Sequence, residues 1–464
     1  MKVCTPTGCI GNRGINKEAF IACLDSENPD VIAVDAGSLD LGPWYLGKGL
    51  PHSPLTNIRW DLDVILSEAV RRKMPVIIGS AGGSGAKSNV DLTIDVIKEV
   101  AKERNLDFRL GRIYADVGKD YLIQRIKKGD KIRKCPVSIF GEEVLTPPNV
   151  EKCTNIVAMM GVEPLIEALK KGADIVIAGR AMDNGVIAAF PVMEGFDLAL
   201  CIHMGDIMEC AETALIDVEG VTRKSGPNRM PVIGEIERDY FLIRPGAPGM
   251  KATVTSVAGH SLYERESPFF SDICNGTIDR RECKFEQYDD RTVKVSGTKL
   301  IRKPYTVLLE GAGKVGYRSI SILGIRNPVM ISQIDEILGK CKEREEERFK
   351  DQGRFQIYYH IYGKNAVLGN WEPEKHISSY ELGLVCETIA ESQYLAHEVV
   401  DDLWLRIMFY RYEGRTTTAG NCAGLFSPLT IDMGEAYENA VYHQMRLENP
   451  LELFPITIKN VKEL

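Results

Sequence analysis

The chain has 464 residues, which is enough for two or three domains with hydrophobic cores of their own. Its 57 basic and 65 acidic residues give a formal net charge of -8 and are mixed along the sequence, which argues against a surface for nucleic acid or anionic membranes. The sequence has no apolar run of about 18 residues, and residues 1–11 lack the apolar core of a signal peptide, so we expect a cytoplasmic protein that binds neither nucleic acid nor membrane.

The 12 cysteines and seven histidines show none of the short paired spacings of a structural zinc or iron–sulfur site. Because no secretory signal is recognisable, we interpret the cysteines as reduced thiols. A hard cation such as Mg²⁺ needs no such spacing when aspartates at strand ends hold it. The sequence therefore leaves the cofactor unknown, with a divalent cation as one alternative.

Residues 1–213 alternate apolar runs with helical patterns. Strands are expected near residues 2–5, 31–35, 75–79, 109–115, 155–160, 174–178 and 199–204, and helices over residues 57–72, 91–104, 119–128 and 163–171. Near-continuous apolar runs are typical of parallel strands that are buried on both faces. The pattern predicts an α/β ligand-binding domain with a mostly parallel layered sheet, doubly wound as the first choice and a barrel as the alternative.

The sequence changes character after Thr213. Residues 214–316 carry short β-branched runs between turn residues, such as 251–257 and 291–296, and predict a β-rich second domain. Residues 317–464 predict a C-terminal α+β portion. In it, helices are expected over residues 330–350 and 393–410, and strands over residues 355–362 and 382–389.

Polar residues follow several of the predicted strands of residues 1–213. Ligands bind at the carboxyl ends of parallel strands, so we expect the loops at 35–40, 79–85, 116 and 179–183 to meet at one pocket. Asp35 and Asp40 are two neighbouring carboxylates that can serve as an acid and a base, or can hold a divalent ion. The alternative is a loop in which each aspartate accepts hydrogen bonds from local backbone N–H groups.

The segment 79–85 is a glycine-rich loop between a predicted strand and a predicted helix. Backbone N–H groups at Ser80, Gly82, Gly83 and Gly85 can receive a phosphate or a carboxylate there. The loop matches neither the dinucleotide-binding fingerprint nor the Walker A motif. The alternative is a tight turn with close backbone packing.

Arg180 and Asp183 follow the strand predicted at 174–178. Arg180 can bind the carboxylate of a substrate through two parallel hydrogen bonds, and Asp183 can act as a base or a metal ligand. The alternative is an ion pair between Arg180 and Asp183 that fixes the loop.

In the β-rich part, His260, Tyr263 and Glu264 form a compact group of acids and bases. Histidine is suited to proton transfer near neutral pH, so His260 and Tyr263 are candidate catalytic residues, although a single histidine can equally serve the fold. A nucleophilic serine or cysteine triad is poorly supported, because the sequence has no Gly-x-Ser-x-Gly motif.

Segments from the whole length of the sequence share motifs with one known family. They are DAGSLDLGP, IIGSAGG, MMGVEP, GADIVIAGRAMD, HMGDIMEC, SVAGHSLYE, YTVLLEGAGKVGYRSISILGIRNP and TTTAGNCAGLFSP. The chain resembles the acyclic terpene utilisation (AtuA-type) family over residues 1–455. This resemblance implies breakdown of branched acids through acyl-CoA intermediates. Some members carry a further small C-terminal domain that does not follow Pro455 here, so a separate small subunit is an open alternative.

Together these features predict an enzyme that acts on a small carboxylic acid or its acyl-CoA thioester. The expected reaction is proton abstraction beside a carbonyl followed by elimination, hydration or isomerisation, as in a lyase, hydratase or isomerase. Arg180 and the 79–85 loop would hold the anionic group, Asp35 or Asp183 would act as base, and His260 with Tyr263 would exchange the second proton. We expect a homo-oligomer. The alternative function is a non-catalytic subunit that binds an acyl ligand or serves as a scaffold in a multi-subunit catabolic enzyme.

Overall fold

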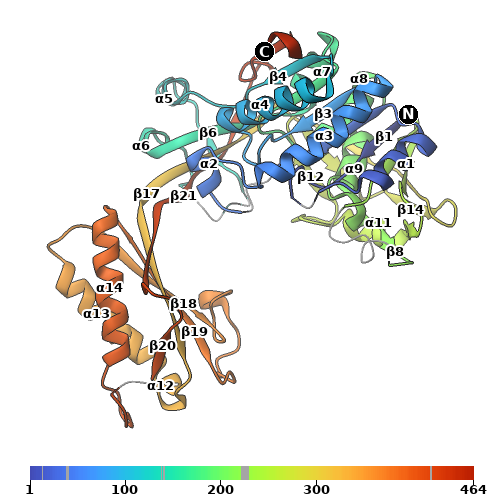
Figure 1. Cartoon of the computed structure of the whole chain (residues 1–464). Coiled ribbons are helices and arrows are strands. Elements are labelled where there is room, and N and C mark those ends of the chain that lie inside the picture. Colours follow the sequence, from blue (N-terminus) through green and yellow to red (C-terminus); the bar gives the residue numbers. More distant parts are fainter. Residues whose placement is uncertain (13, 38–40, 137, 139–141, 221–228, 419–420) are drawn as a thin grey trace. The chain divides into compact units, whose positions relative to one another are not determined.

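The computed structural model describes the chain except residues 13, 38–40, 137, 139–141, 221–228 and 419–420 (Figure 1). The described residues form two compact units. One comprises residues 1–313 and 439–464, and the other comprises residues 314–438. The division of the sequence into 1–213, 214–316 and 317–464 was made on composition and remains a prediction.

The larger unit is built on a ten-stranded sheet. From one edge to the other the strands are β14 (Lys284–Gln287), β15 (Val293–Ser296), β10 (Tyr240–Pro245), β9 (Val232–Ile236), β1 (Lys2–Thr5), β2 (Val31–Asp35), β3 (Val76–Gly79), β7 (Ile175–Ala178), β4 (Arg109–Ile113) and β22 (Ile456–Asn460). The four neighbouring pairs from β1 to β4 are parallel. The remaining pairs of this sheet are antiparallel.

The α/β character predicted for the chain is confirmed, but a mostly parallel sheet is not. Only the centre of the sheet is parallel, because hairpin strands from residues 232–296 extend it beyond β1 and a C-terminal strand pairs with β4. The described strands follow an open order in which β14 and β22 are the edges. The run 291–296 was therefore correctly recognised as a strand, β15, whereas its place in the same sheet as β1 could not be read from the sequence.

Both faces of the parallel centre are covered by helices. Alternate residues of each strand point to opposite faces, so Ile32 and Val34 belong to one hydrophobic cluster and Val31 and Ala33 to another. The first cluster is completed by α1 (Lys17–Glu27), α3 (Leu55–Arg72) and α4 (Lys87–Arg104), the last two of which lie side by side in Figure 1. The second is completed by α7 (Val162–Lys170), α8 (Asp183–Met193) and α9 (Leu198–Met208).

Helix α9 corrects the strand that we expected at 199–204. The side chain of Asp197 accepts a hydrogen bond from the backbone N–H of Leu200 and so caps a helix at this point. Nearly all residues of α9 are buried, so the segment lacks the polar stripe that would reveal a helix in the sequence. A short apolar run cannot by itself distinguish a buried strand from a buried helix.

The remaining elements of this unit surround the sheet. They are α2 (Trp44–Lys48), α5 (Lys119–Lys127), β5 (Arg133–Lys134), α6 (Pro147–Lys152), β6 (Cys153–Met159), η1 (Ala211–Ala214), β8 (Ile216–Asp217), β11 (Met250–Lys251), α11 (Val254–His260), β12 (Phe270–Ile273), β13 (Gly276–Asp279), β16 (Lys299–Arg302) and η3 (Val461–Glu463). None of the helices in the described part of the chain is long and apolar enough to cross a membrane.

The smaller unit has helices packed on an antiparallel sheet, as the α+β expectation for the C-terminal portion predicts. Its elements are α12 (Pro328–Ser332), α13 (Ile334–Phe349), β18 (Phe355–Tyr362), η2 (Gly369–Trp371), β19 (Leu382–Ala390), α14 (Gln393–Phe409) and β20 (Cys422–Gly424). The long strands β17 (Thr306–Ile325) and β21 (Thr430–Arg446) contribute residues to both units. Leu384 of β19 and Val399 of α14 belong to the separate hydrophobic core of this unit.

Candidate functional site

The loops that follow β2, β3 and β7 meet at the carboxyl edge of the parallel strands. A Cβ atom on Gly37 would lie 1.8 Å from the carbonyl oxygen of Gly83, so the first two loops are in backbone contact. A Cβ atom on Gly85 would lie 2.2 Å from the backbone nitrogen of Arg180, which places the third loop against the second. Polar residues from separate strand ends are thus gathered at one edge of the sheet.

A cavity of about 350 Å³ opens at this edge. Of the candidate residues from the sequence, Asp35, Asp183 and Tyr263 line it. The candidates Ser80, Gly82, Gly83, Gly85, Arg180 and His260 do not belong to its lining. Asp40, the second carboxylate predicted in the 35–40 loop, lies outside the described residues.

Asp35 is a buried carboxyl group at the end of β2. Its Oδ2 accepts a hydrogen bond from the backbone N–H of Gly37 at 2.9 Å. Its Oδ1 has no hydrogen-bond partner among the described residues, although the side chain lines the cavity. Burial, followed by the neighbouring charge of Asp183, raises the pKa of Asp35 well above its usual value. Asp35 is thus suited to carry a proton that it can give to a bound molecule.

Asp183 is the first residue of α8 and has a different environment. Arg180 pairs with it at 3.4 Å, and the positive end of the helix dipole also favours a negative charge at this position. Just over a third of the side chain of Asp183 is exposed, so it can reach a molecule in the cavity. The two aspartates therefore face one cavity in contrasting surroundings, which is the arrangement that separates an acid from a base.

Arg180 is buried, and its guanidinium group already forms ion pairs with the carboxylates of Glu310 and Asp183. Its Nε donates to Glu310 on β17 at 2.7 Å, and Nη1 donates to Ser80 Oγ at 3.2 Å. The ion pair with Asp183 that we considered as the alternative is present. These contacts favour a positioning role for Arg180, while its binding to a substrate anion stays a prediction.

The glycine loop makes many contacts within the protein. The backbone N–H groups of Ser80 and Ala81 donate to the carbonyl groups of Gly179 and Ala178, and the N–H of Gly83 donates back to Ser80. The carboxylate of Asp116 accepts from the N–H of Lys87 at the start of α4. These bonds favour the tight-turn alternative for the loop, and its proposed role as an anion cradle stays a prediction.

His260 is not among the residues that line the cavity. The run 251–257 that we read as a strand is instead β11 followed by helix α11, because Thr253 and Ser256 form a capping box that starts the helix. The ring of His260 stacks on Tyr263 with 5.2 Å between the centroids, and its buried Nε2 lacks a partner in the described residues. Burial, followed by the charge of Arg265, lowers the pKa of His260. His260 thus contacts Tyr263, which lines the cavity, but is not itself among the lining residues.

Several lining residues were not predicted from the sequence. Cys9 follows β1, and its Sγ lies 4.0 Å from Nε2 of His52. Glu209, at the end of α9, also lines the cavity, and burial together with the charges of Asp183 and Asp206 raises its pKa well above the usual value. The polar end of the strand at 2–5 follows the same pattern as the other strands and could have identified Cys9. Glu209 follows helix α9, which we had read as a strand, so nothing in the sequence indicated that Glu209 lies at the cavity.

The cysteines at the cavity are thiols rather than activated nucleophiles. Burial, followed by the charge of Asp35, raises the pKa of Cys9, and burial raises the pKa of Cys210 to about 12. Groups of three or more His, Cys, Asp or Glu side chains able to hold a metal ion are not found in the described part of the chain. A site for a divalent cation therefore stays a prediction that the described residues do not support with a ligand set.

Of three comparisons with known proteins, one found a match. Neither the curated proteins nor the solved structures contain a match to this chain. The model of the acyclic terpene utilisation family protein AtuA matches residues 56–421, a range that includes Asp183, Glu209 and Tyr263 of the cavity. Because this match covers most of the sequence, the chain belongs to the acyclic terpene utilisation (AtuA) family.

Proposed function

We propose that this protein is an enzyme that removes a proton next to the carbonyl group of a small carboxylic acid or of its acyl-CoA thioester. Elimination, hydration or isomerisation would complete the reaction. The observation that carries the proposal is the pair Asp35 and Asp183, which line one cavity in contrasting environments. Membership of a family associated with acyclic terpene utilisation agrees with a catabolic role.

In this proposal Asp183 takes the proton from the substrate. Arg180 and the start of α8 stabilise its negative charge, and Glu310 holds Arg180 in place from the other side. Asp35 gives a proton to the opposite side of the reacting group, because burial keeps this carboxyl protonated to a higher pH than an exposed aspartate. The proton that leaves the substrate and the proton that enters the product thus belong to two different carboxyl groups.

Tyr263 would contact the substrate, and His260 would support it. Tyr263 lines the cavity, whereas His260 stacks on its ring. Arg265 on the same loop pairs with the buried Asp206 of α9, so the loop that carries Tyr263 is attached to the core of the unit. His260 is therefore a positioning residue in this scheme, and Tyr263 is the group that exchanges a proton or hydrogen bond with the substrate.

The proposal can be tested without knowing the natural substrate. Exchange of the proton beside the carbonyl can be followed in D₂O by NMR for a panel of 2-hydroxy, unsaturated and branched acids, free and as CoA esters, with and without Mg²⁺. Wild-type protein should exchange at least one of them, and Asp183→Asn should slow that exchange by about 10²-fold or more. Asp116→Asn is the matched control, since Asp116 is also a partly buried carboxyl group that follows a strand but does not line the cavity.

The outcomes separate the two candidate functions. Exchange that depends on Asp183 but not on Asp116 supports the enzyme. If both variants lose proton exchange to the same extent, the loss reflects impaired folding, and Asp183 has no specific role in the mechanism. Binding of an acid or thioester without exchange or turnover in any condition would favour the alternative, a non-catalytic acyl-binding subunit.

A further inference from the structure

The carboxylate of Asp206, on the buried helix α9, joins three separate parts of the chain. Its side chain has no exposed surface. Oδ1 accepts a hydrogen bond from the side-chain amide of Asn184 at 2.6 Å and also pairs with Arg265. Oδ2 pairs with Arg280, the residue that follows β13. A charge buried this deeply is costly unless it is paired, so these partners hold Asp206 and are in turn held by it.

The contact with Asn184 fixes the start of helix α8. Asn184 directly follows Asp183, the proposed base, and is itself buried. A Cβ atom on Gly205, the residue before Asp206, would lie 2.5 Å from the carbonyl oxygen of Asn184, so the backbones of α8 and α9 touch at this point. The carboxylate of Asp206 therefore restrains the residue next to the base.

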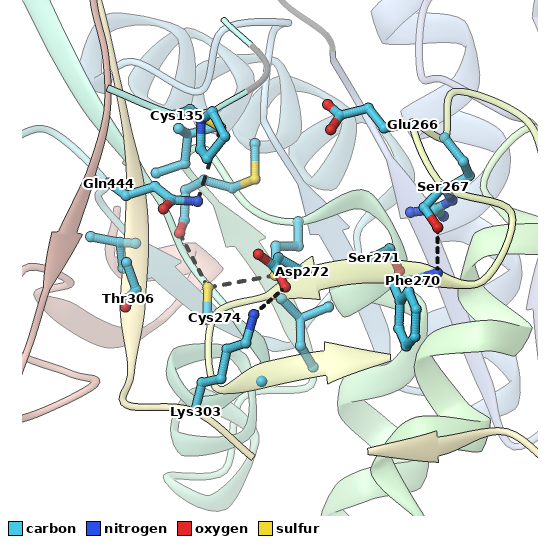
Figure 2. A pocket seen from close by; sticks show the side chains of 18 of the residues that line it. Cys135, Glu266, Ser267, Phe270, Ser271, Asp272, Cys274, Lys303, Thr306 and Gln444 are labelled. Carbon is cyan, nitrogen blue, oxygen red and sulfur yellow. Dashed lines mark hydrogen bonds and ion pairs between the residues drawn. The ribbon is translucent and has the colours of Figure 1, made fainter. Parts of the chain in front are cut away.

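The contact with Arg265 fixes the segment that carries Tyr263 and Glu264, both of which line the candidate site. The backbone φ of Glu264 is 53°, in the left-handed region that residues other than glycine seldom adopt, so neighbouring contacts must hold it there. On the other side of Arg265, Ser267 accepts a hydrogen bond from the backbone N–H of Phe270 at 3.2 Å and so attaches the segment to β12 (Figure 2). This segment is thus anchored at Arg265 and at Ser267.

Helix α9 makes a second polar contact with the same segment. Nε2 of His203, three residues before Asp206, lies 2.7 Å from Oγ of Ser261, and Nδ1 lies 2.7 Å from Oγ1 of Thr298. Burial, followed by the charge of Arg280, lowers the pKa of His203 to about 3, so the ring is neutral, with one nitrogen donating and the other accepting. Two polar residues of this buried helix therefore hold the chain between α11 and β12.

From these contacts we propose that Asp206 is a positioning residue that holds Asp183 and Tyr263 in a fixed relation to each other. Asp206 does not line the cavity, so it acts through Asn184 and Arg265 and not on the substrate itself. The catalytic part of this inference rests on the proposed function, because that function makes Asp183 and Tyr263 act on one substrate. A displacement of about 1 Å at a reacting group can lower a rate by about 10²-fold.

Variants of Arg265 test the link to the segment that carries Tyr263. Arg265→Met removes the contact but leaves Asp206 paired with Arg280. In the D₂O exchange assay this variant should lower kcat by about 10–10²-fold while KM changes by less than about threefold, because geometry in the transition state is lost more than binding. Arg265→Lys keeps a cation beside Asp206 and should recover part of the rate.

Amide hydrogen exchange, measured by mass spectrometry on the full-length protein, tests the positioning without a substrate. In Asp206→Asn, peptides that cover residues 184–190 and 261–267 should both exchange about tenfold faster than in the wild type or more. Arg265→Met should change only the peptide that covers residues 261–267. Because it keeps the pair of Asp206 with Arg280, Arg265→Met decides the question if Asp206→Asn does not fold.

Arg406→Met is the matched control, because Arg406 pairs with the buried Glu345 of the smaller unit and neither residue lines the cavity. It should lower stability without changing kcat or KM. Wild-type kcat in Arg265→Met, or unchanged amide exchange at residues 261–267 in folded Asp206→Asn or Arg265→Met, would overturn the inference. If the wild type exchanges no substrate proton but Asp206→Asn shows faster amide exchange in both peptides, the proposed function is wrong and Asp206 still fixes both segments.

Discussion

Asp61 of α3 accepts a hydrogen bond from the backbone N–H of Gly11 at 2.7 Å. The other oxygen of the same carboxyl group accepts from the N–H of Ile15 at 2.8 Å. The segment between these two residues follows β1, and Gly11 and Asn12 from it line the candidate site. The carboxyl group of Asp61 thus holds two backbone positions after β1, one of which, Gly11, lines the cavity.

The stability of the protein should depend on pH through Asp61. Burial raises the pKa of Asp61 to about 6, whereas an aspartate in an unfolded chain has a pKa of about 3.9. Between these two values the folded state binds the proton more tightly than the unfolded state, so this group favours folding at low pH and its contribution is lost as pH rises through about 6. The free energy of unfolding should fall by up to about 3 kcal/mol across this window from Asp61 alone.

Urea denaturation of the wild type and of Asp61→Asn at several pH values between 4 and 7 measures this effect. In the variant, the free energy of unfolding should not show the decrease with rising pH that Asp61 causes in the wild type. Asp63→Asn is the control, because Arg104 lowers the pKa of Asp63 through a side-chain hydrogen bond and this residue should not contribute to the decrease. Parallel curves for the wild type and Asp61→Asn would show that Asp61 titrates normally in the folded protein.

Gly37→Ala should disrupt the site through the backbone. The new Cβ atom would collide with the carbonyl group of Gly83, and neither backbone can move far while its own loop is held by hydrogen bonds. Overpacking of this kind costs about 1–3 kcal/mol. Thermal and chemical denaturation should show the loss. Gly118→Ala is the control, because a Cβ atom there meets no atom within 4 Å, and equal stability of both variants would contradict the close packing of the two loops.

Arg180→Ala should lower the stability of the folded protein, and its effect should not be limited to a lower affinity for an anionic ligand. The substitution leaves Glu310 buried without its main partner, and removal of one member of a buried ion pair costs about 3–5 kcal/mol. The double variant Arg180→Met with Glu310→Gln should recover much of the stability, since it also removes the charge of Glu310. Chemical denaturation measures both variants. A fully stable Arg180→Ala protein that no longer binds acetate in calorimetry would instead assign Arg180 to anion capture.

Most of the strand positions that were predicted correctly came from one repeated pattern, an apolar run followed by polar residues. The strands β1, β2, β3, β7 and β4 are short, mostly buried and flanked by turn residues, so their positions could be read within a few residues. Because parallel strands share one carboxyl edge, the same pattern predicted Asp35 and Asp183 at one cavity, which both residues line, whereas the 79–85 loop and Asp116, predicted at the same pocket, do not line it. These inferences depend only on local sequence and on a general rule of sheet geometry.

The features that the sequence did not reveal depend on contacts between distant segments. The partner of Arg180 is Glu310, 130 positions later on β17, and no spacing rule connects the two. Helix α9 is buried almost throughout, so its apolar run resembled a strand and Glu209 at its end was overlooked. Strand β9 pairs with β1 across more than 200 residues, which made residues of the second predicted domain part of the first sheet.

Glu209 provides a direct test of which carboxyl groups of the cavity are protonated and which one acts as the base. Burial, Asp183 and Asp206 all raise the pKa of Glu209, so its carboxyl group should be neutral at a pH where an exposed glutamate is ionised. Glutamine has the same shape and no charge, so Glu209→Gln should fold with at least wild-type stability at pH 7 and should retain proton exchange within about tenfold. Asp183→Asn, which removes a charge that the reaction needs, should lose about 10²-fold or more in the same assay. Measurement of exchange rate and unfolding free energy on one preparation of each variant separates activity from folding. An inactive but stable Glu209→Gln protein would show that Glu209 works as a carboxylate, and the assignment of the base would pass from Asp183 to Glu209.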